Sequence, residues 1–297
     1  MISIQPHPLI AKLGLGAAQF GLDSGPCGRG RAPEAEVRDM LALAARSGLG
    51  VLDTAAASVH GEAVLGAVMP RPPVLRITIK APRGDRGAAF VRAETRAALA
   101  RLGVPRADAI MVQSAGDLFA PYGGELWACL KGLREDGLVG RVGISAYASD
   151  DPAGLARRFQ PDLIQAPASL LDQRLLLDGS LARVRDLGVD VHLRSIFLNG
   201  LLFLPPDRAP SQLGDAAIAR LARARRLIVE GRSDPLRAAL GFALSRPEAS
   251  AVIVGAATAA ELTAVIAAAA RPPPELDWDD MALDNPEAAD PRRWAAA

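Results

Sequence analysis

The chain has 297 residues, and half of them are hydrophobic, which is typical of a soluble globular protein. Its 34 basic and 33 acidic residues give a formal net charge of +1, so neither a nucleic acid nor a membrane surface is expected as partner. Two cysteines, Cys27 and Cys129, offer no disulfide framework and no metal-ligand spacing. At the N-terminus no signal-peptide pattern occurs, and no apolar run reaches about 18 residues, so a cytoplasmic location is expected.

Strand and helix patterns alternate from residue 12 onward. The expected strands cover residues 13–18, 51–53, 74–80, 109–112, 139–145, 162–165, 189–194 and 251–255. The expected helices cover residues 32–47, 62–68, 87–102, 124–135, 152–159, 177–187, 216–229, 234–245 and 259–270. The first long helix illustrates the end signals, because Pro33 and Glu34 suit its first turn and Gly48 ends it.

Eight strand–helix units indicate a parallel sheet covered by helices, and eight units in about 250 residues predict a (β/α)8 TIM barrel. A doubly wound sheet is the competing fold, and it normally carries G-x-G-x-x-G in its first turn. The glycines here read Gly14-Leu15-Gly16, so that fingerprint is absent. We expect a single domain over residues 1–297, with the barrel at about 12–270 and a Pro-rich tail at 271–297.

Polar residues stand where the expected strands end. In a barrel of parallel strands these ends meet on one rim, which is the face that carries active sites. The rim positions are Asp53, Lys80, Gln113, Ser114, Ser145, Gln165, Arg194, Ser195 and Gly255. Their polarity predicts a binding or catalytic site there, although Asp53 alone could simply cap a turn.

Several segments, in this order, resemble the aldo-keto reductase superfamily. They read LGLGAAQFGLDSG, VLDTAAAS, EAVLG, RITIK, VGISAY, IQAPASLLDQR, LRSIFLNGLL and SAVIVGAATAAEL. The resemblance covers nearly the whole chain. It implies direct hydride transfer between a nicotinamide cofactor and a carbonyl or alcohol, with the cofactor bound without a Rossmann fold.

The resemblance also implies a catalytic tetrad of Asp, Tyr, Lys and His, and half of it is replaced. Asp53 and Lys80 match the family's aspartate and lysine, whereas Ser58 stands at the tyrosine position and Gln113 at the histidine position. A serine hydroxyl is a much weaker acid than a phenol, and Gln113 donates a hydrogen bond but transfers no proton. Ordinary carbonyl reduction should therefore be slow unless another group supplies the proton, since general acid catalysis contributes roughly 10²–10⁴-fold.

Other side chains are candidates for the missing acid. His60 lies two residues past Ser58 and has a suitable pKa, although a solvated loop histidine is the simpler interpretation. Tyr147 follows the fifth expected strand and could reach over the rim or pack. Tyr122 belongs to a loop and has the weakest case, and His192 is better interpreted as a buried barrel residue.

Cofactor positions of the family are better preserved. Gln165 matches the residue that hydrogen-bonds the nicotinamide carboxamide in the family, and Ser145 precedes the usual Asn position, which is Ala146 here. The segment that matches the one wrapping the pyrophosphate contains Arg194, Ser195, Phe197 and Gly200. Gly255, Ala257 and Thr258 begin the last helix, where free amides suit a phosphate. The family's habit is NADP; NAD is possible here, because Glu261 stands near the 2′-phosphate position.

We therefore expect an aldo-keto reductase-like oxidoreductase with non-standard proton-transfer residues. In it Asp53 and Lys80 set the electrostatics, Gln113 orients a carbonyl, and Ser58 or His60 relays the proton. The substrate expected from the family's range is a small carbonyl compound or a sugar derivative. The alternative is a non-redox descendant on the same barrel, which is a lyase, an epimerase or a binding protein. Monomer and homo-oligomer both remain open.

Overall fold

The computed structural model of the chain describes residues 7–21, 32–54, 59–204, 208–283 and 285–294. Within these residues, eight parallel strands pair in sequence order and close into a barrel. They are β1 Leu13–Gly16, β2 Val51–Asp53, β3 Arg76–Lys80, β4 Ala107–Val112, β5 Val139–Ser145, β6 Leu163–Pro167, β7 Asp190–Arg194 and β8 Ala249–Gly255. The predicted (β/α)8 TIM barrel is confirmed.

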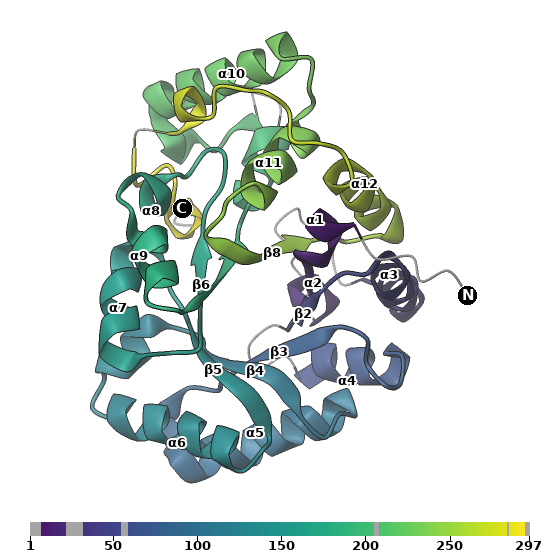
Figure 1. The fold of residues 1–297 in the computed structure, drawn as a ribbon, viewed down its shortest axis with the longest axis vertical. Coiled ribbons are helices and arrows are strands. Elements are labelled where there is room, and N and C mark those ends of the chain that lie inside the picture. Colours follow the sequence, from purple (N-terminus) through teal and green to yellow (C-terminus); the bar gives the residue numbers. More distant parts are fainter. Residues whose placement is uncertain (1–6, 22–31, 55–58, 205–207, 284, 295–297) are drawn as a thin grey trace.

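The helices form the outer ring around the strands (Figure 1). The main ones are α3 Glu34–Ser47, α4 Val59–Val68, α5 Ala88–Leu102, α6 Gly123–Glu135, α7 Pro152–Phe159, α9 Ser180–Asp186, α10 Gly214–Glu230, α11 Pro235–Leu244 and α12 Ala259–Ala269. Shorter helices are α1 Pro8–Ala11, α2 Ala18–Gly21 and α8 Arg174–Leu177. Of the helices in the described ranges, none has both the length and the apolar composition that a membrane crossing requires.

The helix expected over residues 177–187 corresponds to α9, which begins three residues later and ends one residue earlier, and the sequence did not indicate the short α8 before it. Helix α8 ends at Leu177 and α9 begins at Ser180. Between them Gly179 adopts φ +72°, a left-handed conformation that breaks a helix and that glycine adopts without steric cost. Helix α4 also begins at Val59, three residues before the expected start at Glu62.

Small residues inside the barrel let large ones meet on its axis. A Cβ on Gly14 would lie 2.5 Å from Ile253 Cδ1, and one on Gly143 would lie 2.7 Å from Leu163 Cγ. The lower barrel is therefore filled by aliphatic side chains. Outside it, strand and helix faces share the main hydrophobic core, which includes Cys129 as a buried free thiol, and a second cluster joins α10, α11 and the C-terminal segment. Cys27 lies outside the described residues.

Helices α4 and α5 approach each other closely, and this fixes the chain that follows β2. A Cβ on Gly66 would lie 1.9 Å from the carbonyl oxygen of Arg101. Beside this contact, Arg101 pairs with the buried Glu62 at 2.7 Å and with Glu94 at 2.5 Å. Burial raises the pKa of Glu62 and its hydrogen bond to Arg101 opposes this. The pair joins α4 to α5 directly after the segment that carries Asp53.

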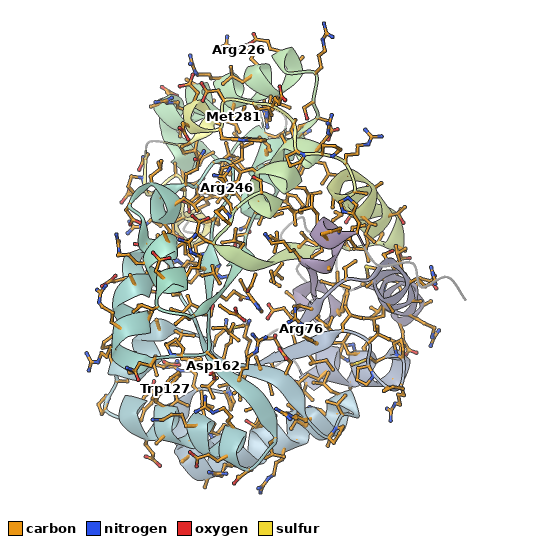
Figure 2. The ribbon with its side chains drawn as sticks, in the orientation of Figure 1. Arg76, Trp127, Asp162, Arg226, Arg246 and Met281 are labelled. Atoms are coloured by element: carbon orange, nitrogen blue, oxygen red, sulfur yellow. The ribbon has the colours of Figure 1, made fainter. Side chains whose placement is uncertain are left out.

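The C-terminal segment packs back onto the barrel instead of trailing from it. Met281 is fully buried, and it lies beside α10, as Figure 2 shows. Further along, the backbone N–H of Leu283 donates to the carbonyl of Leu171 at 2.9 Å. The described chain ends beside α8 (Figure 1), where Arg174 donates to the carbonyls of Pro286 and Ala289. The Pro-rich tail thus reaches the loops after β5 and β6.

Candidate active site at the mouth of the barrel

Three expected site residues meet at the ends of β2, β3 and β6. Lys80 Nζ donates to Asp53 Oδ1 at 2.6 Å and to Gln165 Oε1 at 3.0 Å. The side chains of Lys80 and Asp53 are only 6 % and 12 % exposed. Parallel strands bring their carboxyl ends to one rim, which is why residues 27 and 85 positions apart touch here. The expected ion pair between Asp53 and Lys80 is confirmed.

Opposing electrostatic effects act on the pKa of Lys80. Burial lowers the pKa of Lys80, the charges of Asp53 oppose this, and the nearby Arg194 lowers it further. Among the described residues Lys80 Nζ has two acceptors, so one of its three N–H groups is left for a ligand. A group of this kind can stabilise negative charge that develops on a bound oxygen.

Gln165 offers a second unsatisfied donor. Its Oε1 accepts from Lys80, which fixes the amide orientation, whereas its buried Nε2 has no hydrogen-bond partner in the described part of the chain. Ser145 at the end of β5 is opposite Gln165 in the strand register and is also buried. Buried donors without partners cost stability unless a ligand or water satisfies them, so Gln165 Nε2 indicates a binding position beside Ser145.

His192 lies below this cluster, opposite Gln165 in the register of β6 and β7. It is 1 % exposed and its Nδ1 has no partner among the described atoms. Burial, followed by the charges of Arg141, Lys80 and Arg76, lowers the pKa of His192 to about 3. The imidazole is therefore neutral at physiological pH, and the interpretation of His192 as a barrel-interior residue is confirmed.

Arg194, at the end of β7, reaches back toward the loop after β5. Its Nη2 donates to the carbonyl of Ala146 at 3.1 Å and its Nη1 to Ser195 Oγ at 3.2 Å. The guanidinium carbon lies 4.2 Å from the ring centroid of Tyr147, and that of Arg292 lies 3.5 Å from the same centroid. Tyr147 is therefore packed between charged neighbours, and Arg292 of the C-terminal segment belongs to the rim.

The turn after β7 has an unusual backbone. Ser195, Leu198 and Asn199 have φ values of 58°, 44° and 51°, and Gly200 follows at 83°. Left-handed conformations of non-glycine residues cost of order 1–3 kcal/mol each and concentrate at ligand-binding positions. The ring of Phe197 packs edge-on against Phe203 at 5.4 Å and holds the turn. The sequence assigned this same segment to the cofactor.

The N-terminus of α12 already holds carboxylates. Ala257 N–H donates to Glu261 Oε2 at 2.8 Å, Ala259 N–H donates to Glu36 Oε1, and Thr258 caps the helix through the N–H of Glu261. These contacts engage amides that were expected to face a phosphate. Gly255 precedes them at the exposed end of β8. Two carboxylates at this helix end disfavour a further negative charge.

The remaining candidates are not joined to the cluster. Ser58 lies outside the described residues. His60 on α4 and Gln113 beyond β4 are exposed, and neither makes a described hydrogen bond to Asp53, Lys80 or Gln165. Tyr122 donates to Asp117 at 3.0 Å within its own loop. No group of metal-ligating side chains occurs among the described residues.

Two cavities adjoin the rim on the side of Tyr147. The smaller one, of about 20 Å³, is bounded by Arg194, Ser195 and Leu198 on the barrel and by Asp290 and Pro291 of the tail. The larger one, of about 630 Å³, opens between Ser149, Arg174 and the tail residues Glu287, Arg292 and Arg293. Sequence reasoning missed this contribution of the tail. The signal available was the run Asp290-Pro291-Arg292-Arg293, which carries charge and a helix-start pattern.

Comparison with known proteins is consistent with this geometry. A sequence profile of the Aldo/keto reductase family matches residues 12–282. No curated protein matches the chain. Among solved structures, the holo form of aldo-keto reductase AKR11C1 from Bacillus halodurans aligns with a TM-score of 0.72 at 20 % identity, covering 91 % of this chain and 89 % of that one. PA4992 from Pseudomonas aeruginosa, which is described as an aldo-keto reductase, aligns with a TM-score of 0.64 at 22 % identity, covering 88 % and 90 %.

Proposed function

Because the chain belongs to the aldo/keto reductase family, we propose that it is an oxidoreductase acting on a carbonyl or alcohol substrate with a nicotinamide cofactor. The observation that carries the proposal is the buried contact of Lys80 with Asp53 and Gln165 at the barrel mouth. It presents an ammonium N–H beside an amide donor without a partner among the described residues. This combination suits a site that binds a nicotinamide and a carbonyl oxygen side by side.

The residues at the rim fit a nicotinamide cofactor. Gln165 Nε2 can donate to the carboxamide oxygen, and Ser145 lies opposite it to complete that contact. The turn from Ser195 to Gly200 supports a role in holding the pyrophosphate, because Ser195 and Gly200 are left-handed and Phe197 fixes the loop by packing against Phe203. Gly255, Ala257 and Thr258 border the adenosine end of the proposed site.

The bound cofactor supplies or accepts the hydride. Lys80 then stabilises the charge that develops on the substrate oxygen, and Asp53 opposes the lowering of the pKa of Lys80 by burial. Gln113 would orient the carbonyl from the loop after β4. Ser58 or His60 supplies the proton to the substrate oxygen. Because His60 is not hydrogen-bonded to Asp53, Lys80 or Gln165 in the described structure, a water molecule can carry the proton between them.

NAD is favoured over NADP as the cofactor. Glu36 and Glu261 both accept hydrogen bonds from amides at the start of α12. A 2′-phosphate in this region would meet two carboxylates, whereas a ribose diol can donate hydrogen bonds to them. The carboxylates thus reverse the preference for NADP that the family's habit suggests.

A non-redox descendant of the family is the second candidate. The exposed, unconnected positions of His60 and Gln113 favour it, because they leave the described rim without an evident proton donor. The test is hydride transfer, followed as the change in NADH absorbance over a panel of aldehydes, ketones and sugar-derived carbonyls. Turnover supports the oxidoreductase, and binding of NADH without turnover on the whole panel supports the non-redox descendant.

A further inference from the structure

Arg194 and Arg292 lie against the ring of Tyr147, and Arg174 lines the same cavity as Tyr147. Of these three arginines, two have a carboxylate partner among the described residues. Arg174 pairs with Asp172 at 2.8 Å, and Arg292 of the tail pairs with Asp290 at 2.6 Å. Arg194 forms no ion pair with a described carboxylate. Its contacts are the carbonyl of Ala146, the hydroxyl of Ser195 and the ring of Tyr147.

Arg194 is partly buried, and burial lowers the pKa of its guanidinium. A charge in such a place costs free energy unless an opposite charge compensates it. The acid that acts on Arg194 from the barrel is Asp53, which Lys80 already engages at 2.6 Å. The rim therefore carries a positive charge that an anionic ligand would compensate.

The position of Arg194 relates this charge to the reaction centre. Arg194 lowers the pKa of Lys80, and Asp53 opposes the pKa shift of Arg194, so the three groups share one electrostatic field. Its Nη2 bonds the loop directly after Ser145, which directs the guanidinium across the mouth. A ligand that touches Lys80 with its carbonyl oxygen can thus extend toward Arg194.

We propose that Arg194 binds a carboxylate of the carbonyl substrate, and that the substrates are oxo acids or sugar acids. A planar guanidinium binds a carboxylate through two parallel hydrogen bonds, which gives specificity as well as affinity. The inference rests on the proposed function. Its rival is the cofactor's pyrophosphate, the same anion chemistry from another source, to which the sequence assigned this segment.

Arg246 provides a matched control at the other end of the barrel. It donates to the hydroxyl of Ser245 at 3.3 Å and to the carbonyl of Phe242 at 3.1 Å, and it lies 4.4 Å from the ring centroid of Phe242. Figure 2 labels it beside α11, ahead of the start of β8. Its local contacts therefore repeat those of Arg194 without access to the rim.

The experiment compares three oxo acids with their methyl esters at saturating NADH. Pyruvate, acetoacetate and levulinate place the carbonyl at increasing distance from the carboxylate. We expect the best acid-to-ester ratio of kcat/KM to fall about 10–100-fold in Arg194→Met, as for a lost charge-assisted hydrogen bond, and to stay unchanged in Arg246→Met. Arg194→Lys, which keeps the charge without the fork, should retain part of the ratio.

Calorimetry of the same acids on the cofactor-free protein gives a readout without turnover. Saturable binding that Arg194→Met abolishes and Arg246→Met preserves supports the proposal. An unchanged acid-to-ester ratio in Arg194→Met overturns the proposal. If NADH binding weakens in the same variant, Arg194 holds the pyrophosphate instead. If the wild type reduces no carbonyl, the proposed function fails, and calorimetry alone then tests the inference. Equal binding of the acids by wild type and Arg194→Met would overturn it.

Discussion

Lys80 and Asp53 form an ion pair of 2.6 Å at the mouth of the barrel, and both side chains are nearly withdrawn from solvent. The pair joins β2 to β3 and orients Gln165 through the second hydrogen bond of Lys80. Since each charge compensates the other in a buried setting, the pair is structural as well as chemical.

Asp53→Asn should therefore destabilise the fold. It leaves the ammonium of Lys80 buried without a counter-charge, which costs about 3–5 kcal/mol. The measurement is the free energy of unfolding in urea. The double variant Asp53→Asn, Lys80→Met removes the stranded charge and should recover much of the loss. Equal stability of Asp53→Asn and wild type would show that the pair is not buried as described.

Gly66→Ala should destabilise the protein by about 1–3 kcal/mol or more, as overpacking does. The added methyl group meets the backbone of Arg101 at 1.9 Å, which no rotamer change can relieve. Gly124→Ala is the control, because Gly124 lies in α6 with no atom within 4 Å of an added Cβ. That variant should be neutral or more stable, since alanine favours a helix. Similar losses of stability in both variants would contradict the close approach of α4 and α5.

The free energy of unfolding should decrease as the pH falls, because His192 is buried in its neutral form. Its pKa is about 3 in the folded state against 6.5 without the protein environment, so the neutral form favours folding. This contribution is complete above pH 6.5 and is lost as the pH falls toward 3, at up to about 1.4 kcal/mol per pH unit.

His192→Gln should reduce the change in the free energy of unfolding between pH 6.5 and 4.5. In this range the carboxylates contribute less to the pH dependence. His60→Gln is the control, since it removes a histidine that is exposed on α4. An unaltered slope in His192→Gln would place the titrating group elsewhere.

The double variant Ser58→Tyr, Gln113→His introduces the residue types that the family has at these two positions. If the natural rim lacks an efficient acid, carbonyl reduction should rise roughly 10²–10⁴-fold, the contribution of general acid catalysis. The measurement is kcat/KM on simple aldehydes, with each single variant for comparison. No gain over wild type would indicate that the natural protein already has an adequate proton donor. His60→Ala then tests whether that donor is His60.

The barrel could be predicted from the sequence because each unit carries its own signals. Apolar runs at β5 and helical spacing at α7 give their observed bounds directly. The start of α9 was expected three residues early because Gly179 is one glycine inside an otherwise continuous helical pattern, and the short α8 was missed.

At the site, the pairing of Asp53 with Lys80 followed from the resemblance to the family, and the two residues end neighbouring strands in the structure. The roles of Glu36 and Arg292 could not be predicted from the sequence. Glu36 reaches the start of α12 from 223 residues away, and Arg292 reaches Tyr147 from the tail. Such contacts depend on how the outer segments pack, and periodicity along the chain carries no information on this.

The central claim is that this rim binds a nicotinamide cofactor through Gln165, and fluorescence titration tests it most directly. Wild-type protein should bind NADH saturably in the micromolar range and NADPH more weakly, because of Glu36 and Glu261. Gln165→Leu removes the amide donor and should weaken NADH binding about tenfold, equivalent to about 1.4 kcal/mol. If neither NADH nor NADPH binds saturably below about 1 mM, the account is contradicted. A Kd of about 1 mM corresponds to a binding free energy of only about 4 kcal/mol.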